Sequence, residues 1–495
     1  MKKLIFILCL LLTHALQAQM LLKGKINHAK PGQKVNVNVP YDVWYHKQNS
    51  QEVALNTKGE FTVVLPVKKP QTIFLDFDGT RLYLYAEPSK TLTIQADAKD
   101  FINSLKFKGK LAPENAFWYK TGLTMQKLYP QNWNDTLTYP SEILASIKAS
   151  QATALQTLKN AKLRNKNFLR ITAADISYFA SSKLFDLIYK NDVWSVGHVS
   201  KHSRQEWLEA LKTAYSNQPL SNVSAIGSFH YGQTIAYYPR FLEMSCQSKE
   251  EFMKLCEEIF GKPFAEINKE VRAKGENYWQ YKALNYGLEG HALENALASL
   301  ITNGLESGEI AYLPEAYEDF LKKFPNSSHK AHLTEAMKPL LQSKTATVTT
   351  EIILEENSSN FKLLEEILAQ HKGKAVYIDM WGSWCGPCRE EFKYTAALKE
   401  KFKGKPVDFV YIAFEHSSEP EKTWKDMITF YMLEGRHILG SKELEEYFRN
   451  LYASKGTLSY PSYLLIDKNG EVVNLQAERP SAGEKLYNQI EQLLR

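Results

Sequence analysis

Two cysteines separated by one glycine and one proline are the residues whose spacing points most clearly to chemistry. Residues 376–378, shortly before Cys385, are valine, tyrosine and isoleucine, a run typical of a strand buried on both faces. After Cys388 and Arg389 the apolar residues recur at helical spacing. The stretch therefore predicts a strand, a tight turn and a helix, with both thiols at the N-terminus of the helix.

Thiols at a helix N-terminus are activated by their position. The unpaired backbone N–H groups and the positive end of the helix dipole favour an anion there, which lowers the pKa of a thiol. The thiolate is the reactive form, so we expect Cys385, first in the turn, to be the exposed nucleophile. Cys388, one turn into the helix, is then the resolving thiol that attacks the mixed disulfide.

Metal binding is the alternative use of such a pair. A zinc site would need two further soft ligands at recognisable spacing. The chain has no second Cys-x-x-Cys and no Cys-x-x-His pair. The sequence therefore predicts a redox pair, with no metal and no other cofactor.

The residues around the pair carry a family resemblance. The segment Trp384-Cys-Gly-Pro-Cys388, preceded by Asp379 and Trp381, resembles the active site of the thioredoxin superfamily. The resemblance implies that Asp379 is a buried carboxylate beneath the disulfide, and such a group could take the proton from Cys388. The alternative is that Asp379 is a core acid held by structural partners.

A second acidic residue follows the pair. Glu391, three positions after Cys388, looks like the second acidic residue of the TlpA/ResA-like branch of the superfamily. It could equally be a solvated residue on the polar face of a helix. Lys393 stands where most relatives carry a proline that kinks the helix, so we expect a straighter active-site helix here.

A proline far along the chain completes the resemblance. Pro461 lies just before an apolar run, as does the cis-proline that faces the thiols in this fold, and it follows Cys385 by 76 positions. That separation fits the inserted helix of TlpA-like proteins. The resemblance makes Trp384, Tyr460 and Pro461 substrate-binding residues, although Tyr460 could instead simply pack on Trp384 as part of the rim.

The N-terminus reads as a secretory signal peptide. Two lysines precede an apolar run at residues 4–12, and small residues lead to Ala18, after which we expect cleavage. Residues 1–18, including Cys9, would then be lost, with no stable membrane insertion of the mature protein. This predicts a periplasmic or otherwise exported protein.

Composition indicates a globular protein of several domains. The 495 residues are 44% hydrophobic and 23% charged, and the net charge of +6 is spread without a block of lysine or arginine, which argues against a nucleic-acid partner. We expect a β-sandwich domain at 19–110, an irregular α-helical domain at 111–342, and an α/β thioredoxin-like domain at 343–495. Alternation of period two supports the first, and capping-box signals support the helices. These signals are Ser203-x-x-Glu206, Ser248-x-x-Glu251 and, before the last helix, Ser481-x-x-Glu484.

Two further cysteines lie in the predicted helical domain. Cys256 falls about 12 Å along a helix that begins after Ser248, whereas Cys246 precedes the cap, so a disulfide between them is awkward. We expect a buried free thiol at Cys256, with a disulfide as the alternative.

The predicted function is that of an exported thiol-disulfide oxidoreductase that reduces protein disulfides through a mixed disulfide on Cys385. Glycine and proline between the cysteines are the dipeptide of reducing thioredoxins. A reductant in an oxidising compartment must be recharged, which implies a membrane electron donor. A disulfide isomerase or oxidase, and a partner-binding scaffold with a redox-regulated domain, are the alternatives.

Overall fold

The computed structural model describes residues 19–42, 44–46, 49–123, 138–190, 202–216, 218–343, 352–417, 419–453 and 456–495. The chain forms two compact units, one of Met1–Gly261 with Gln280–Ser299, the other of Lys262–Trp279 with Leu300–Arg495. The predicted signal peptide and Cys9 lie outside the described residues. Among the helices that are described, none is both long and apolar enough to cross a membrane. The predicted domain boundaries near residues 110 and 342 remain predictions.

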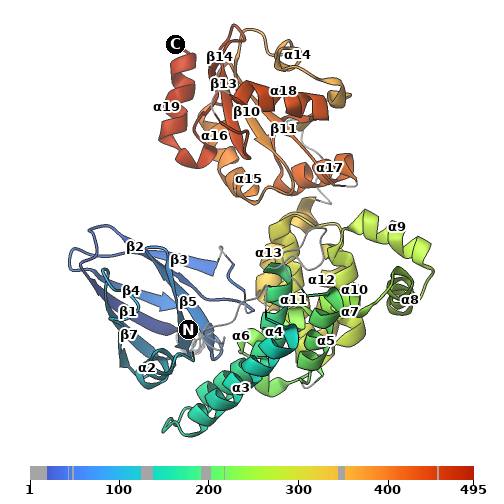
Figure 1. Cartoon of the computed structure of the whole chain (residues 1–495). Coiled ribbons are helices and arrows are strands. Elements are labelled where there is room, and N and C mark those ends of the chain that lie inside the picture. The colour runs from blue at the N-terminus through green and yellow to red at the C-terminus, as the bar shows by residue number, and fades with distance from the viewer. Residues whose placement is uncertain are drawn as a thin grey trace, which may run out of the picture. The chain divides into compact units, whose positions relative to one another are not determined.

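The N-terminal part of the chain consists of two four-stranded sheets (Figure 1). One has the strand order β4-β1-β7-β8 and the other β3-β2-β5-β6. The inward side chains of both sheets belong to one hydrophobic cluster. That the two sheets form a sandwich stays a prediction. The bounds are β1 Met20–Asn27, β2 Lys34–Asn38, β3 Ser50–Ala54, β4 Glu60–Leu65, β5 Gln71–Phe77, β6 Thr80–Ala86, β7 Thr91–Asp97 and β8 Lys106–Gly109.

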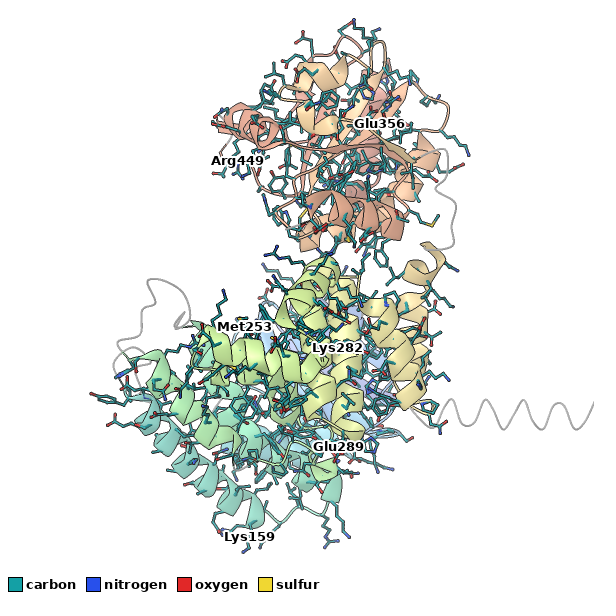
Figure 2. The ribbon with its side chains drawn as sticks, turned by 90° about the vertical axis from the view of Figure 1, so that its right-hand side faces the viewer. Lys159, Met253, Lys282, Glu289, Glu356 and Arg449 are labelled. Carbon is teal, nitrogen blue, oxygen red and sulfur yellow. A yellow bond between two sulfur atoms is a disulfide. The ribbon has the colours of Figure 1, made fainter. Side chains whose placement is uncertain are left out.

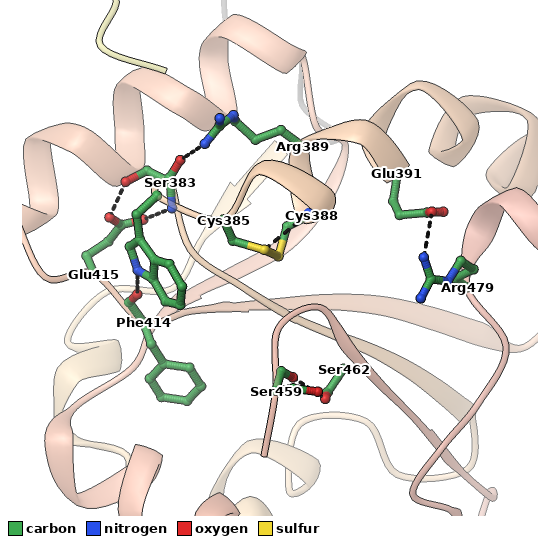
Figure 3. Close-up of a disulfide and its surroundings, with 11 residues drawn as sticks. Ser383, Cys385, Cys388, Arg389, Glu391, Phe414, Glu415, Ser459, Ser462 and Arg479 are labelled. Atoms are coloured by element: carbon green, nitrogen blue, oxygen red, sulfur yellow. Dashed lines mark hydrogen bonds and ion pairs between the residues drawn. A yellow bond between two sulfur atoms is a disulfide. The ribbon is translucent and has the colours of Figure 1, made fainter. Parts of the chain in front are cut away.

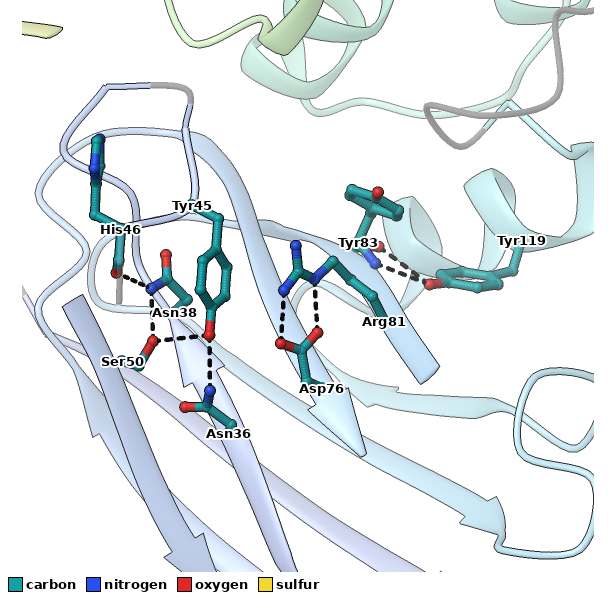
Figure 4. Close-up of polar contacts among 9 residues, drawn as sticks. All are labelled: Asn36, Asn38, Tyr45, His46, Ser50, Asp76, Arg81, Tyr83 and Tyr119. Carbon is teal, nitrogen blue, oxygen red and sulfur yellow. Dashed lines mark hydrogen bonds and ion pairs between the residues drawn. The ribbon is translucent and has the colours of Figure 1, made fainter. Parts of the chain in front are cut away.

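Strand β2 shows how the alternating sequence is used. Val35 and Val37 are fully buried in the cluster, as the period of two predicts. The intervening Asn36 and Asn38 are not simply solvated: Asn36 donates to the Tyr45 hydroxyl at 2.8 Å, and Asn38 donates to the His46 carbonyl at 2.6 Å (Figure 4). These two amides tie the segment that follows β2 back onto the strand.

The middle of the chain is helical, as predicted. Ser203 begins α5 with a complete capping box, and the Ser248 side chain accepts from the Glu251 backbone N–H at the start of α8. Cys246 and Cys256 are both free, and Cys256 is buried. The helices are α2 Ala112–Thr121, α3 Pro140–Lys159, α4 Lys166–Lys190, α5 Arg204–Tyr215, α6 Phe229–Ala236, α7 Tyr238–Ser245, α8 Lys249–Phe260, α9 Phe264–Lys274, α10 Asn277–Gly287, α11 Gly290–Ser307, α12 Leu313–Lys323 and α13 Lys330–Ser343.

The C-terminal region has the thioredoxin-like α/β arrangement that the resemblance implies. Its six-stranded sheet has the order β14-β13-β10-β11-β12-β9. Strands β10, β11, β12 and β9 are parallel, β13 is antiparallel to β10, and β14 is antiparallel to β13. The strands are β9 Ile352–Leu354, β10 Ala375–Trp381, β11 Val407–Ala413, β12 Gly435–Leu439, β13 Ser462–Ile466 and β14 Val472–Asn474. The helices are α14 Leu364–Leu368, α15 Gly386–Glu391, α16 Thr395–Lys401, α17 Pro420–Tyr431, α18 Lys442–Tyr452 and α19 Glu484–Leu493.

Strand β10 is the centre of this region because it is buried on both faces. Val376, Ile378 and Met380 pack into one hydrophobic cluster, with side chains of α14 and α18. Ala375 and Tyr377 pack into a second cluster, with side chains of α16 and α19. Figure 1 shows these helix pairs on opposite sides of the sheet. Both layers therefore fix the strand that leads into the cysteines.

Two local expectations are wrong. The active-site helix is not straighter without a proline: α15 ends at Glu391, a 3₁₀ turn occupies Phe392–Tyr394, and only then does α16 begin. Ser481 does not cap α19, whose N-cap is Gly483 and has no side-chain cap. The hydroxyl and backbone N–H of Ser481 instead donate to the Glu391 carboxylate, so this side chain does not cap α19.

Candidate active site

The redox pair lies where β10 gives way to α15. Cys385 is the N-cap of α15, and Cys388 lies in its first turn. The two are joined by a disulfide, with their Cα atoms 5.3 Å apart (Figure 3). The Cys388 backbone N–H points at the Cys385 sulfur, 3.2 Å away. In the reduced protein the same N–H would stabilise a thiolate on Cys385, because donors aimed at a sulfur favour its anion.

The exposed position expected for Cys385 is not what the oxidised structure shows. Cys385 is 4% exposed and Cys388 is completely buried. The roles of Cys385 as nucleophile and Cys388 as resolving thiol stay predictions.

Asp379 lies in the centre of β10 and is 1% exposed. Within the part of the chain that the structure describes, neither carboxylate oxygen has a hydrogen-bond partner. Burial raises its pKa well above the ordinary range, and the charge of Glu391 raises it further. The alternative that Asp379 is a partnered core acid therefore has no support in the described residues.

The residues beside Asp379 explain how it is kept dry. Tyr411 of β11 and Tyr463 of β13 are its direct neighbours in the sheet register, so their rings flank it on the same face. The Lys399 ammonium lies 4.8 Å from the centre of the Tyr411 ring. Its positive charge opposes the rise in the pKa of Asp379 without overcoming the effect of burial.

Glu391 is buried and bonded, so it is not a solvated helix residue. Its carboxylate accepts the Ser481 backbone N–H at 2.8 Å and the Ser481 hydroxyl at 2.9 Å. Arg479 lies 3.6 Å from the same carboxylate (Figure 3). Glu391 thus joins the end of α15 to the turn before α19. Its negative charge also raises the pKa of Asp379.

The predicted substrate-binding residues form an aromatic rim. Trp384 is half-exposed, and the Tyr460 ring meets it edge-on with the ring centres 5.3 Å apart. The Tyr460–Pro461 peptide bond is cis, as the resemblance implies. The Tyr460 hydroxyl donates to Glu445 at 3.0 Å, and Glu445 also pairs with Arg449, which is drawn at the surface in Figure 2. Tyr460 is therefore held in place at both its ring and its hydroxyl.

Sequence reasoning missed the polar residues that surround the approach to Cys385. Glu415, just after β11, accepts the backbone N–H of Ser383 at 2.8 Å and its hydroxyl at 2.5 Å. Arg389 donates to the Ser383 carbonyl (Figure 3). Glu415 lies 32 positions from Ser383, and only the parallel pairing of β10 with β11 brings them together. No local pattern could have indicated this contact.

Among the described residues there is no group of three or more histidine, cysteine or acidic side chains that could hold a metal ion. The described arrangement brings together two sulfurs, a buried carboxylate and the groups that position them.

Comparison with known proteins places the region in a family. The Redoxin family matches residues 361–490. The C-terminal region is a thioredoxin-superfamily domain of the TlpA/ResA-like kind. The match to Redoxin spans the cysteines, Asp379, Glu391 and Pro461, so this chain carries a thiol-disulfide oxidoreductase domain.

The individual relatives are thiol-disulfide oxidoreductases by name, and each match covers only a small part of this chain. The "Thiol-disulfide oxidoreductase ResA" of Bacillus cereus (strain ATCC 10987) is 28% identical over 130 residues, which are 26% of this chain and 66% of that protein. ResA of Bacillus subtilis (strain 168) is 41% identical over 54 residues, 11% of this chain and 29% of that protein. The solution structure of a candidate thiol-disulfide oxidoreductase from Bacteroides vulgatus is 32% identical, covering 26% of this chain and 78% of that one, with a TM-score of 0.22. The chain thus covers less than two thirds of the curated relatives' length.

Replacing Asp379 with asparagine should stabilise the protein more at high pH than at low pH. The folded-state pKa is raised above the unfolded one, so ionisation costs stability progressively as pH rises through that interval. We expect a gain of roughly 1–3 kcal/mol at pH 8, because each unit between the folded and unfolded pKa is worth about 1.4 kcal/mol, and a smaller gain at pH 5. Hydrogen exchange of the β10 amides measures the local free energy of opening.

The partly exposed Asp426, which pairs with Lys422, provides the matched control. Asp426→Asn should leave the β10 amides unchanged at both pH values. An equal gain for Asp379→Asn at pH 5 and pH 8 would contradict a raised pKa at Asp379.

Proposed function

We propose that the protein is an exported thiol-disulfide oxidoreductase that reduces protein disulfides. One observation carries the proposal: a disulfide at the N-terminus of α15 lies in a domain whose central strand holds a buried carboxylate with no hydrogen-bond partner among the described residues. The domain family and the ResA relatives support the chemistry. Beyond this chemistry, we propose that electrons flow from the enzyme to the substrate and that the protein is exported.

In the first step the reduced enzyme attacks its substrate. The Cys385 thiolate, favoured by the Cys388 N–H, attacks one sulfur of the substrate disulfide. A bond forms between Cys385 and that sulfur, and the bond between the two substrate sulfurs breaks. The first substrate thiolate leaves and takes up a proton. Trp384 and Tyr460, which border the site, contact the incoming chain in this proposal.

In the second step Cys388 releases the product. Cys388 loses its proton, and we assign Asp379 as the group that accepts it, because a carboxylate with a raised pKa is a base matched to a thiol. The Cys388 thiolate attacks the Cys385 sulfur, the mixed disulfide breaks, and the second substrate thiolate leaves with a proton. Two electrons have passed to the substrate, and the enzyme is left as the Cys385–Cys388 disulfide. Glu391 acts here through Asp379, whose pKa its charge raises.

The cycle closes only if the enzyme is reduced again. In an oxidising compartment we assign this to a membrane electron donor that delivers two electrons to the disulfide. The partners in this proposal are thus disulfide-bonded proteins on one side and that donor on the other. The signal peptide that the sequence predicts is the support for export.

Turnover of a disulfide-bonded model protein, with dithiothreitol as the electron source, tests the proposal. We expect the wild-type chain to accelerate reduction and Cys385→Ser to abolish that acceleration. Cys388→Ala should instead accumulate a mixed disulfide on Cys385, visible by mass spectrometry as one substrate chain per enzyme. A wild-type chain that only binds the substrate, without turnover, would favour the scaffold. Faster disulfide formation or reshuffling than reduction would favour the oxidase or isomerase.

Replacing Tyr460 with threonine should change which substrates react. Its ring meets Trp384 edge-on and narrows the mouth of the site, so a smaller residue should admit larger chains. We expect kcat/KM for a large protein disulfide to rise by about threefold relative to that for a small disulfide, a modest steric effect for one side chain. The redox potential should move only slightly.

Tyr487 on α19 serves as the control, because its ring packs on Phe402 in the second hydrophobic cluster. Tyr487→Thr should leave the ratio of the two kcat/KM values unchanged. An unchanged ratio for Tyr460→Thr as well would show that Tyr460 is only part of the rim and does not select substrates.

A further inference from the structure

We propose that Glu415 is a positioning residue of the redox centre, which acts through Ser383 to hold the turn of the two cysteines in its closed shape. We call the group formed by Glu415, Ser383 and Arg389 the Ser383 clamp. The proposal rests on the proposed function, because it assigns Glu415 a role in the same redox reaction. Sequence reasoning gave Glu415 no role, and it does not touch the sulfurs.

All three polar atoms of Ser383 are engaged. Its N–H and its hydroxyl both donate to the Glu415 carboxylate, one to each oxygen, at 2.8 and 2.5 Å. Its carbonyl accepts from the Arg389 guanidinium. Ser383 is 8% exposed, so these bonds lie largely out of water and are charge-assisted. A residue held at every polar atom has little freedom to move when the disulfide opens.

Arg389 closes the turn from its other end. Ser383 precedes Cys385 by two residues, and Arg389 directly follows Cys388. The bond between them therefore spans the pair of cysteines and joins the chain before the first sulfur to the chain after the second. Burial lowers the pKa of Arg389, but its ordinary value is so high that the guanidinium stays charged.

The clamp is anchored to the central sheet. Glu415 follows β11, which is paired in parallel with β10. The preceding residue, Phe414, donates its N–H to the Trp381 carbonyl at 2.9 Å and accepts the Trp384 indole N–H at 2.8 Å. Residues 414 and 415 thus bind three residues that precede Cys385: Trp381, Ser383 and Trp384. The contact between Ser383 and Glu415 is drawn in Figure 3.

This arrangement favours the closed turn in both redox states. Reduction by glutathione converts the Cys385–Cys388 disulfide and two glutathione thiols into two protein thiols and one glutathione disulfide. If the clamp holds the two thiols close together, the reduced turn gains little freedom, and the protein disulfide re-forms readily. Weakening the clamp frees the reduced turn and shifts the equilibrium towards the thiols.

The experiment measures that equilibrium constant with glutathione for the full chain and its variants. Ser383→Ala removes one clamp bond and leaves every charge in place. Glu415→Gln keeps an oxygen acceptor and removes the charge. Each should raise the equilibrium constant for reduction by about fivefold, a part of the stabilisation that a charged hydrogen bond provides. Arg389 is not replaced, because it also donates to the Glu306 carbonyl.

Non-additivity is the decisive result. Ser383→Ala and Glu415→Gln act on the same bonds, so the double variant should shift the constant little more than the larger single change. The matched control is Glu446→Gln, the same chemical change at an exposed position of α18. Glu446→Gln should leave the equilibrium constant at the wild-type value. Combined with Ser383→Ala, it should give the same constant as Ser383→Ala alone.

The outcomes separate the clamp from the function. Single variants that lower the unfolding temperature but leave the equilibrium constant equal to that of Glu446→Gln would overturn the clamp and leave the oxidoreductase proposal intact. Single effects that multiply fully in the double variant would also overturn it. A wild-type chain that reaches no thiol-disulfide equilibrium with glutathione would contradict the proposed function itself.

Discussion

The burial of one carboxylate, which has no hydrogen-bond partner in the described part of the chain, is the constraint on which the proposed redox centre depends. Asp379 occupies a central strand that is covered on both faces, and removing it from water makes its ionised form costly. Such a cost is retained at functional sites because a carboxylate with a raised pKa can exchange a proton with a thiol. Tyr411 and Tyr463 on the neighbouring strands help to bury this group.

The surrounding structure holds the turn of the two cysteines in a fixed position. Helices on both faces fix β10, and β10 delivers the chain to Cys385 at the N-cap of α15. Glu391 joins the end of α15 to the segment before α19, and Glu415 holds the segment before Cys385. Three acidic residues therefore have three separate tasks. In our proposal Asp379 accepts the proton of Cys388, Glu391 raises the pKa of Asp379 and joins two segments, and Glu415 positions the turn of the cysteines.

The sequence was sufficient for the features that depend on local pattern. The strand, turn and helix around the cysteines follow from a change of period and from the glycine and proline between them. The cis bond before Pro461 followed from the family resemblance. Ser481 was misassigned because a serine three residues before a glutamate also fits a capping box, and only the fold brings Glu391 within reach of its hydroxyl. The helix break at Lys393 was missed because a 3₁₀ turn needs no proline. Ser383 and Glu415 meet through strand pairing, which no local motif records.

The most direct test of the account is the titration of the Asp379 carboxyl carbon by NMR, in the oxidised and in the reduced protein, with Asp379→Asn to assign the signal. The account predicts a midpoint above the ordinary value of about 3.9 in both states. It also predicts that the midpoint differs between them, because in the reduced protein the carboxylate and the Cys388 thiol titrate as a coupled pair. A midpoint near the ordinary value, or identical curves in the two states, would contradict Asp379 as the proton acceptor.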